Sequence, residues 1–475
     1  MNHSMIMDFY ELTMANGYFD TKYKDTIVYF DIFYRKNPYS GGYAVFCGLD
    51  SIVKYINELE FTDNDIKYLE SKNCFTKEFL EYLRTFKFSG DIYSFKEGSI
   101  IFPNEPVVTI KANAIEAQII ETYLLLLFNH QSLIATISRR IVVAAGGRPV
   151  MEFGARRAHG ASSAILGSRA GYISGCVGTS CTGTDQVFGV PALGTMAHSW
   201  VQMFDSEYEA FVYYCKKYPH NVTLLVDTYN VIKSGIPNAI KAFNEVLKPL
   251  GITKCAIRID SGDITYLSKK SRKMLDEAGW QTCKICVSNS LDEYIISDVL
   301  SQGACIDSFG VGEKLITSKS EPVFGGVYKL AAIEEDGVII PKIKKSENIA
   351  KITNPGYKKV YRIYEDNHMI ADLIALHDEE FDPSLPLTIF DEHQVWKQRT
   401  FTDYKIVEQQ VPIFLNGKQV YTLPSTEEVR KYAEEQYNML WDEVTRFNNP
   451  QEYYVDLSEK LYKLKYGMLE KLGKN

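Results

Sequence analysis

The sequence predicts an irregular, TIM-like α/β barrel together with a second α+β domain built from both ends of the chain. Between residues 140 and 330, short apolar runs alternate with amphipathic helical segments, which is typical of a parallel sheet. Many of these runs end in small or polar residues, and active sites of α/β barrels gather at the carboxyl ends of their strands. The two flanking regions lack this alternation.

The expected strands of the central region are six apolar runs: RPVMEFGARR (148–157), PALGTMAHSW (191–200), TLLVDTYN (223–230), KCAIRIDSGD (254–263), KICVSNSL (284–291) and CIDSFGVG (305–312). Helices are expected at 237–250 and 266–278. A third should start at Ser290, where Glu293 completes a capping box, and end near Gly303. An open doubly wound sheet is the alternative. The barrel is favoured because polar residues end many strands and no single Gly-rich first turn stands out.

The pattern divides the chain into residues 1–135, 136–330 and 331–475. In the first region, 91–112 reads as a compact β unit and 114–137 as a long apolar helix. The third region begins with strand-like runs such as KKVYRIYED (358–366) and closes with two expected helices, 426–447 and 450–472. We expect this third region to pack back on the first.

Composition narrows the class of protein. The chain has 475 residues and a net charge of −8, which argues against a general binder of nucleic acid or membrane surfaces. Its start lacks the pattern of a signal peptide, and its most apolar stretch, 123–128, is too short to span a bilayer. We therefore expect a cytoplasmic protein. Cys283 and Cys286 form a CxxC, but its context reads as a buried strand and not as a metal or redox site.

The segment Arg258 to Asp263 is the sharpest local feature. An apolar strand ends in an arginine, two carboxylates (Asp260 and Asp263), a hydroxyl and a glycine. Arginine clamps phosphate through a rigid fork of donors, and a carboxylate accepts hydrogen bonds from ribose hydroxyls or holds Mg²⁺. These residues suit a sugar phosphate. The alternative is a buried ion pair beside a turn.

Glycine-rich turns follow two apolar runs, at Gly310 with Gly312 and at Gly325 with Gly326. Backbone N–H groups in such turns can cradle a phosphate, although Gly pairs are also common in ordinary turns. No GxxxxGK[ST] pattern occurs, so a P-loop of that kind does not hold ATP.

Two further strand ends carry candidate residues. Phe153 could stack on a flat heteroaromatic ring, and Arg156 or Arg157 could pair with a carboxylate on that ring. The alternative is that the two arginines form a solvated pair beside a core phenylalanine. His198 lies among small residues in GTMAHSW and could attack a phosphoryl group, or it could be structural. Asp227 ends the next strand and is expected to orient the His198 ring.

Together these segments resemble the nicotinate phosphoribosyltransferase family. The matching pieces run in family order over about 320 residues: DFYELTMANGYF (8–19), FDIFYRKNPYSGGYAVFCGL (30–49), EFGARRAHG (152–160), GTDQVFGVPALGTMAHSW (183–200), VDTYNVIKSG (226–235), RIDSGD (258–263), VSNSLDE (287–293), FGVGEKL (309–315) and GGVYKL (325–330). No single motif is specific, but the ordered set is.

The resemblance implies that the chain joins nicotinate to the ribosyl carbon of phosphoribosyl pyrophosphate for NAD biosynthesis, giving nicotinate mononucleotide and pyrophosphate. It implies coupling to ATP hydrolysis through a phosphorylated histidine, here His198, and a need for Mg²⁺. Small neighbours such as Thr195 leave room for a triphosphate and supply donors. The family fold is an irregular α/β barrel with a second domain built from both chain ends.

The resemblance also implies site residues and a homodimer. Tyr10, in the N-terminal DxY motif, should lie over the base in the partner's site. Similarity to the related nicotinamide enzyme places Phe153, Arg156 and Asp185 around the base, and Arg258 with Asp260 at phosphate and ribose. One departure is Glu313, where some relatives carry threonine: either it points away from the phosphate or it helps to bind Mg²⁺.

Three rival functions fit the residues less well. A quinolinate-using relative needs extra basic groups and no phosphorylated histidine, and the paired arginines at 156 and 157 favour nicotinate over nicotinamide. A sugar-phosphate isomerase or aldolase needs a base or a Schiff-base lysine at a strand end, and none of the quoted segments places a lysine there. A non-catalytic metabolite sensor is disfavoured by the combination of Arg258, Asp260 and Asp263 with His198.

Overall fold

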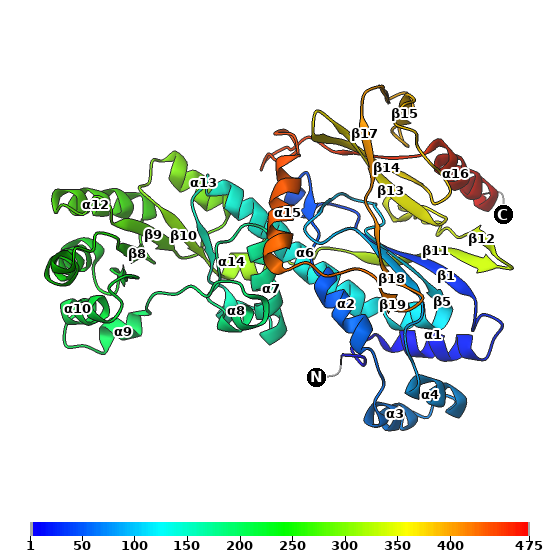
Figure 1. The fold of residues 1–475 in the computed structure, drawn as a ribbon, viewed down its shortest axis with the longest axis horizontal. Coiled ribbons are helices and arrows are strands. Elements are labelled where there is room, and N and C mark those ends of the chain that lie inside the picture. The colour runs from blue at the N-terminus through cyan, green and yellow to red at the C-terminus, as the bar shows by residue number, and fades with distance from the viewer. Residues whose placement is uncertain (1–2, 474–475) are drawn as a thin grey trace. The chain divides into compact units, whose positions relative to one another are not determined.

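The computed structural model describes residues 3–473, and the chain forms two compact units (Figure 1). Unit 1 contains the residues up to Leu133 and from Val323 onward, and unit 2 contains Ile134–Pro322. The long helix α6 (Glu121–Ala144) begins in unit 1 and ends in unit 2. The second boundary lies just before strand β11 (Val327–Glu335), so that strand stays whole.

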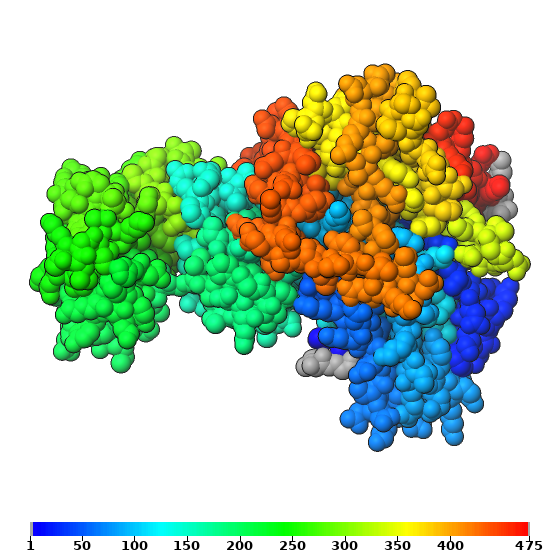
Figure 2. Space-filling model, in the orientation of Figure 1, coloured from blue at the N-terminus to red at the C-terminus, as the bar shows by residue number. Residues whose placement is uncertain are grey.

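An antiparallel sheet of seven strands is the framework of unit 1, in the order β12-β11-β1-β5-β3-β18-β19. Its remaining strands are β1 (Ile27–Phe33), β3 (Asp91–Ser94), β5 (Val108–Asn113), β12 (Val338–Pro341), β18 (Val411–Leu415) and β19 (Lys418–Gln419). Strand β1 pairs with β11 on one side and β5 on the other, so segments before and after unit 2 share one sheet. Figure 2 shows the orange C-terminal segment over the blue and cyan N-terminal segments.

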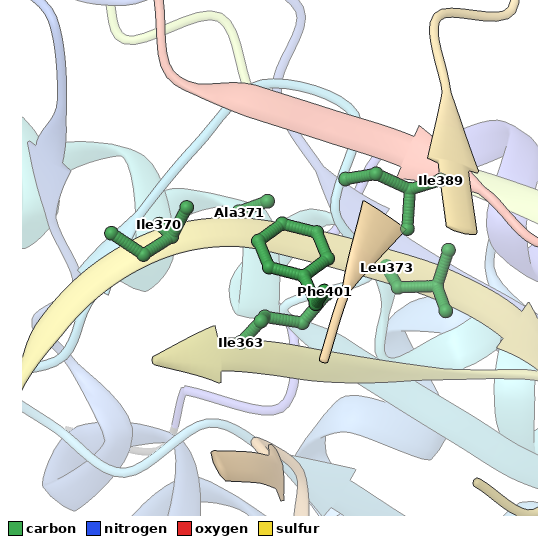
Figure 3. Close-up of a cluster of buried hydrophobic side chains, with 6 residues drawn as sticks. All are labelled: Ile363, Ile370, Ala371, Leu373, Ile389 and Phe401. Atoms are coloured by element: carbon green, nitrogen blue, oxygen red, sulfur yellow. The ribbon is translucent and has the colours of Figure 1, made fainter. Parts of the chain in front are cut away.

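A second sheet of unit 1 has the order β17-β13-β14-β20, with bounds Lys405–Glu408, Lys358–Glu365, His368–Leu376 and Tyr454–Leu457. Together with the hairpin of β15 (Leu387–Phe390) and β16 (Gln398–Phe401), it encloses a cluster of buried apolar side chains (Figure 3): Ile363, Ile370, Ala371, Leu373, Ile389 and Phe401. A short pair, β2 (Ala44–Val45) and β4 (Ile100–Ile101), completes the strands. The helices of unit 1 are α1 (Phe9–Phe19), α2 (Leu49–Glu58), α3 (Asp63–Glu70), α4 (Lys77–Arg84), α5 (Ala114–Ile119), α15 (Thr426–Asn438) and α16 (Glu459–Gly473).

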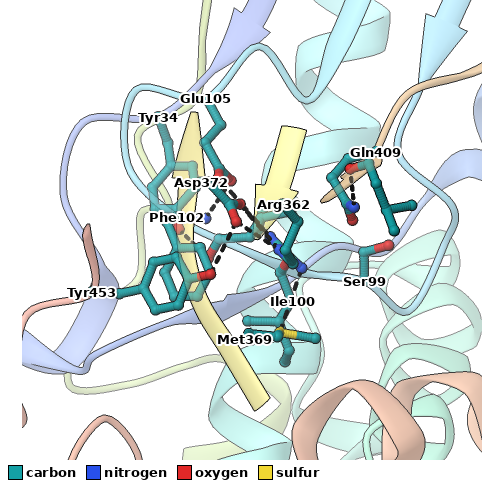
Figure 4. A network of polar contacts seen from close by, with 12 residues as sticks. Tyr34, Ser99, Ile100, Phe102, Glu105, Arg362, Met369, Asp372, Gln409 and Tyr453 are labelled. Atoms are coloured by element: carbon teal, nitrogen blue, oxygen red, sulfur yellow. Dashed lines mark hydrogen bonds and ion pairs between the residues drawn. The ribbon is translucent and has the colours of Figure 1, made fainter. Parts of the chain in front are cut away.

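A buried charge network joins the two chain segments inside unit 1 (Figure 4). Arg362 Nη2 donates to Asp372 Oδ2 at 2.6 Å and to the Ile100 carbonyl at 3.0 Å. The Tyr453 hydroxyl donates to Asp372 Oδ1 at 2.9 Å, and Glu105 Oε1 lies 3.9 Å from the same arginine. Burial and the neighbouring Asp372 hold the pKa of Glu105 well above its usual range.

The sheet of unit 2 is entirely parallel, in the order β6-β10-β9-β8-β7. Its strands are β6 (Val150–Glu152), β7 (Thr223–Leu225), β8 (Ala256–Ile259), β9 (Lys284–Ser288) and β10 (Ser308–Val311). Single parallel bridges extend it from Glu152 to Thr179 and from Thr179 to Ala192. The predicted alternation of strand and helix is confirmed, except that the run expected as a strand at 191–200 forms only the single bridge at Ala192 before α9 begins. A closed barrel is not, because no pairing joins Ala192 to β7 among the described residues.

Four of the described helices of unit 2 lie between β6 and β7 in the chain, and the later helices alternate with the strands. In chain order the helices of unit 2 are α7 (Ala161–Ile173), α8 (Thr182–Phe188), α9 (His198–Gln202), α10 (Glu207–Lys217), α11 (Ile236–Ala242), α12 (Ile264–Glu277), α13 (Glu293–Ser301) and α14 (Glu313–Ile316). The helical path expected over 237–250 is continuous but changes character after α11, with a π-helical turn at Phe243–Leu247 and a 3₁₀ turn at Lys248–Leu250.

Several predicted boundaries are wrong. Helix α13 is capped by Asp292, whose side chain accepts from Ile295 N, while Ser290 adopts a positive φ of 48°. The expected helix 114–137 is divided at Ile120 into α5 and α6, and the helix expected over 426–447 ends at Asn438. The start of the expected helix 450–472 is strand β20, because parallel pairing with β14 overrides the local preference.

No helix within residues 3–473 is long and apolar enough to cross a membrane.

A buried carboxyl fastens α1 to the start of α6. Glu11 Oε1 accepts from Thr122 N at 3.0 Å and from the Thr122 hydroxyl. Burial raises the pKa of Glu11 from its ordinary value of 4.5 to about 8, because the charged form loses hydration. The stability that this carboxyl gives is therefore full below pH 4.5 and is lost as the pH rises through about 8.

We predict that Glu11→Gln gains stability relative to the native chain as the pH rises from 5 to 8, because the amide never ionises. The melting midpoint should shift by about 2–4 °C for each kcal/mol gained. Thermal unfolding followed by circular dichroism at both pH values measures this, with the exposed Glu70→Gln as the control. A difference between variant and native chain that stays constant over that pH range contradicts the prediction.

Candidate active site

Polar side chains gather at the carboxyl edge of the parallel sheet. Asp227 comes two residues after β7, Asp260 follows β8 directly, and Ser288 is the last residue of β9. Because parallel strands end at the same edge, these three side chains come together.

The Asp227 carboxylate supports the turn after β8. Its Oδ2 accepts from the backbone N of Asp260 at 3.1 Å and from Ser261 Oγ at 2.6 Å. Its Oδ1 is buried and has no hydrogen-bond partner among the described residues. The expectation that Asp227 orients His198 is therefore wrong: Asp227 positions the neighbouring turn and keeps one unused acceptor.

His198 is the first residue of the short helix α9, so its predicted place at a strand end is wrong. Its Nδ1 lies 3.2 Å from Thr228 Oγ1, and its Nε2 lies 3.7 Å from Asp260 Oδ2. The other oxygen of Asp260 accepts from Ser288 Oγ. Thr228 and Asp260 thus hold the imidazole, whose side chain is 42% exposed and open to a ligand.

Arg258 is tied to the segment that carries His198. Its Nη1 donates to Thr195 Oγ1 at 2.6 Å, and the Tyr214 hydroxyl holds the Thr195 carbonyl at 3.2 Å. The Nε of Arg258 is buried with no hydrogen-bond partner among the described residues. A guanidinium with an unused donor can pair with an oxyanion.

Phe153 lies beside this cluster. Its ring occupies the space above Gly310, where an added Cβ would come within 2.6 Å of the ring and 3.3 Å of Ser288 Cβ. Gly310 lies inside β10 and pairs with both β6 and β9. It therefore makes room for the ring, and the expectation that it belongs to an open phosphate-binding turn is wrong. A Cβ on Gly312 would lie 3.0 Å from the Phe153 carbonyl.

The remaining candidates of unit 2 lie around this edge. Arg156 and Arg157 are exposed in the 3₁₀ turn Ala155–Arg157, directly after Phe153. Asp185 Oδ2 accepts from Ala192 N at 3.2 Å, and Asp263 caps α12 by accepting from Tyr266 N at 2.8 Å.

Glu313 is engaged by a neighbouring lysine. Lys319 Nζ donates to its Oε1 at 2.6 Å. That ammonium lowers the pKa of the Glu313 carboxyl. The charge of Glu313 is thus balanced by Lys319, and this ion pair does not require a metal.

Three of the predicted site residues belong to unit 1. Tyr10 lies on α1 and is 45% exposed, and burial together with the neighbouring Glu121 raises the pKa of its hydroxyl. Gly325 adopts a φ of 78°, which favours glycine. Gly326 N donates to Asn129 Oδ1 at 2.7 Å, and a Cβ there would lie 2.8 Å from the Phe128 ring.

Sequence reasoning missed Thr228 and Ser288. Each comes at the end of an apolar run that is expected to form a strand, and a polar residue at such an end is a usable signal. Within residues 3–473, no three His, Cys, Asp or Glu side chains come together as a metal-binding group.

Comparisons with known proteins agree with this architecture. The family model of the nicotinate phosphoribosyltransferase N-terminal domain matches residues 5–129, and that of the C-terminal domain matches residues 357–465. The chain is 42% identical to nicotinate phosphoribosyltransferase of Bacillus subtilis (strain 168), over 96% of this chain and 93% of that protein. It is 32% identical to the Caenorhabditis elegans enzyme of that name, over 96% of this chain and 92% of the other.

Two solved structures are similar in fold. Human nicotinic acid phosphoribosyltransferase superimposes with a TM-score of 0.85 at 25% identity, covering 98% of this chain and 100% of the other. The nicotinate-nucleotide pyrophosphorylase of Pyrococcus furiosus has a TM-score of 0.71 at 24% identity, covering 92% and 96%. With relatives above 30% identity along almost the whole length, the chain belongs to the nicotinate phosphoribosyltransferase family.

Proposed function

We propose that this protein joins nicotinate to the ribosyl carbon of phosphoribosyl pyrophosphate, giving nicotinate mononucleotide and pyrophosphate for NAD biosynthesis. The observation that supports this most is the contiguous edge formed by Phe153, Asp260 and His198 in a chain that is 42% identical to a named member of the family. In this reading Phe153 stacks on the base and the neighbouring arginines pair with its carboxylate.

The reaction depends on positioning the two substrates more than on acid–base catalysis. A ribosyl cation develops as pyrophosphate leaves, while the ring nitrogen of nicotinate, unprotonated at neutral pH, forms the new bond. We assign Asp260 to the ribose and Arg258, with its unused Nε, to phosphate. Their work is to hold the two reacting atoms close and to balance the leaving charge.

Mg²⁺ fits this site as a companion of the substrate phosphates. Magnesium usually keeps several waters and binds through one or two carboxylates plus phosphate oxygens. The carboxylates of Asp227 and Asp260 are of that kind, and Asp227 Oδ1 is an unused acceptor. When bound, Mg²⁺ would neutralise pyrophosphate charge.

We predict turnover of nicotinate and little turnover of nicotinamide. Arg156 or Arg157 gains an ion pair from a carboxylate and none from a neutral amide, and a site built for a charged group rejects the analogue that lacks it by about 10²-fold or more. Mononucleotide formation from nicotinate, nicotinamide and quinolinate, each with and without ATP, measures the preference. Equal kcat/KM for nicotinate and nicotinamide would exclude the assignment.

ATP coupling is proposed to pass through His198. The imidazole nitrogen would attack the γ-phosphorus of ATP, so that an N–P bond forms, the bond to the bridging oxygen breaks and ADP leaves. Water would later cleave the N–P bond and release phosphate. The nitrogen that does not attack keeps the ring proton, and either Thr228 at Nδ1 or Asp260 near Nε2 can accept a hydrogen bond from it.

We therefore predict that γ-labelled ATP places acid-labile, base-stable label on the peptide that contains His198. His198→Ala should lose coupled ATP hydrolysis while keeping part of the ribosyl transfer, because the base and sugar contacts do not use the imidazole. His159→Ala, which removes an exposed histidine of the same unit, is the matched control. Label that persists in His198→Ala would make His198 a structural residue.

A homodimer with shared sites is the last part of the proposal, with Tyr10 reaching the partner's base site. Its support is a half-exposed tyrosine on α1 among exposed apolar neighbours such as Phe9, which is 49% exposed. We predict that mixing inactive Tyr10→Ala with inactive Asp260→Ala restores up to about a quarter of native activity, because half of a statistical mixture is mixed dimer with one intact site of two. No recovery after proven subunit exchange places Tyr10 outside the partner's site.

A further inference from the structure

A fully buried carboxylate lies behind the base site. Glu152 is the last residue of β6 and has no exposed surface. Its Oε2 accepts from Thr179 Oγ1 at 2.6 Å and from Ser168 Oγ at 2.8 Å. Its Oε1 accepts from the backbone N of Gly154. Three donors from three segments of the chain thus converge on one side chain.

Gly154 and Gly171 let the backbone pack closely against Glu152. A Cβ on Gly154 would lie 2.7 Å from Glu152 Oε1 and 2.5 Å from Ile316 Cβ. A Cβ on Gly171 would lie 3.7 Å from Glu152 Cγ. Burial raises the pKa of the Glu152 carboxyl, and the three hydrogen bonds oppose that shift. Burying a carboxylate costs free energy unless it is hydrogen-bonded, so these three hydrogen bonds hold Glu152 and its donors in place.

The hydrogen bonds of Glu152 constrain the backbone on both sides of Phe153, the next residue in the chain. Phe153 lies between Glu152 and Gly154, and its own N donates to the Val311 carbonyl at 2.7 Å. The Gly154 carbonyl accepts from Arg157 N at 2.7 Å and so opens the 3₁₀ turn that carries both arginines. The Glu152 bond to Gly154 N therefore fixes the backbone between the ring and the arginines.

We propose that Glu152 is a positioning residue for the base site: by holding the Gly154 amide it sets the direction of the Phe153 ring and of the arginine turn. The inference rests on the proposed function, because it needs Phe153 and the arginines to contact nicotinate. Glu152 does not touch the substrate, so its removal should weaken nicotinate binding and spare phosphoribosyl pyrophosphate.

The test compares steady-state constants of the full-length enzyme. Glu152→Ala should raise the KM for nicotinate roughly tenfold, the size expected when one positioning hydrogen bond is lost, and change the KM for phosphoribosyl pyrophosphate less than about twofold. Glu152→Gln keeps an oxygen for the Gly154 amide, and the hydroxyls of Ser168 and Thr179 can rotate to accept from its NH₂. It should therefore restore most of the nicotinate affinity.

Two further variants separate positioning from folding. Glu293 is an equally buried carboxylate of unit 2, paired with Arg140 Nε at 3.1 Å. Glu293→Gln should lower the melting temperature and leave the KM for nicotinate unchanged. If Glu152→Ala does not fold, Thr179→Val removes one donor and should raise the KM for nicotinate about two- to threefold, as a partial loss of the same support.

The outcomes are distinct. Equal rises in both KM values for Glu152→Ala, or no rescue by Glu152→Gln, would overturn the inference and leave Glu152 a folding residue. Phe153→Ala in the same assay tests the proposed function itself. If Phe153→Ala raises the KM for nicotinate and Glu152→Ala does not, only the positioning role fails; if Phe153→Ala has no effect, the base site is wrongly assigned and both fail.

Discussion

The Asp227 carboxylate supports the turn on which the rest of the candidate site depends. By accepting from the Asp260 amide and the Ser261 hydroxyl, it fixes where the Asp260 side chain points. Asp260 in turn reaches His198 on one oxygen and Ser288 on the other. Because strands β7, β8 and β9 run parallel, one correctly held carboxylate at their common edge is enough to order the three neighbouring side chains.

Two clusters of buried charge in this chain differ in how far their polar atoms are satisfied. In unit 1, Arg362 and Asp372 are fully buried and meet through several hydrogen bonds, and Tyr453 satisfies the carboxylate further. In unit 2, Asp227 Oδ1 and Arg258 Nε are left without partners within the described residues. A buried ion pair that satisfies itself serves the fold, whereas unused donors and acceptors at a strand edge cost stability until a ligand binds. Among the described residues, unpaired buried atoms also occur in unit 1, for example Arg35 Nε and Gln436 Oε1. Those of Asp227 and Arg258 differ because they lie among the candidate site residues.

Much of this arrangement could be predicted from local patterns. The apolar runs that lead to Asp227 and Asp260, and the run that contains Gly310, form short parallel strands, since burial on both faces leaves a clear apolar signature. The failures have physical causes. Asp292 replaces Ser290 as a helix cap because Ser290 takes a positive φ, and Tyr454–Leu457 becomes a strand because β14 offers it a partner far away in the sequence. Periodicity does not report either constraint. Periodicity also cannot show that Thr228, and not Asp227, lies beside His198. Neighbouring side chains point in different directions, so a shift of one residue changes which of them faces the imidazole ring.

The proposed energy coupling would require that phosphate binding and the chemistry at His198 influence each other, and such influence is reciprocal by thermodynamic linkage. The segment from Thr195 to His198 meets that requirement in its contacts. Thr195 accepts from Arg258, which is assigned to phosphate, and three residues later His198 approaches Asp260, which is assigned to ribose. Tyr214 holds the Thr195 carbonyl and gives the segment a fixed end. An anion that draws the guanidinium away from Thr195 must change the hydrogen bonding of the segment that presents the imidazole. Coupling of this kind needs no long pathway, since one short segment touches both groups.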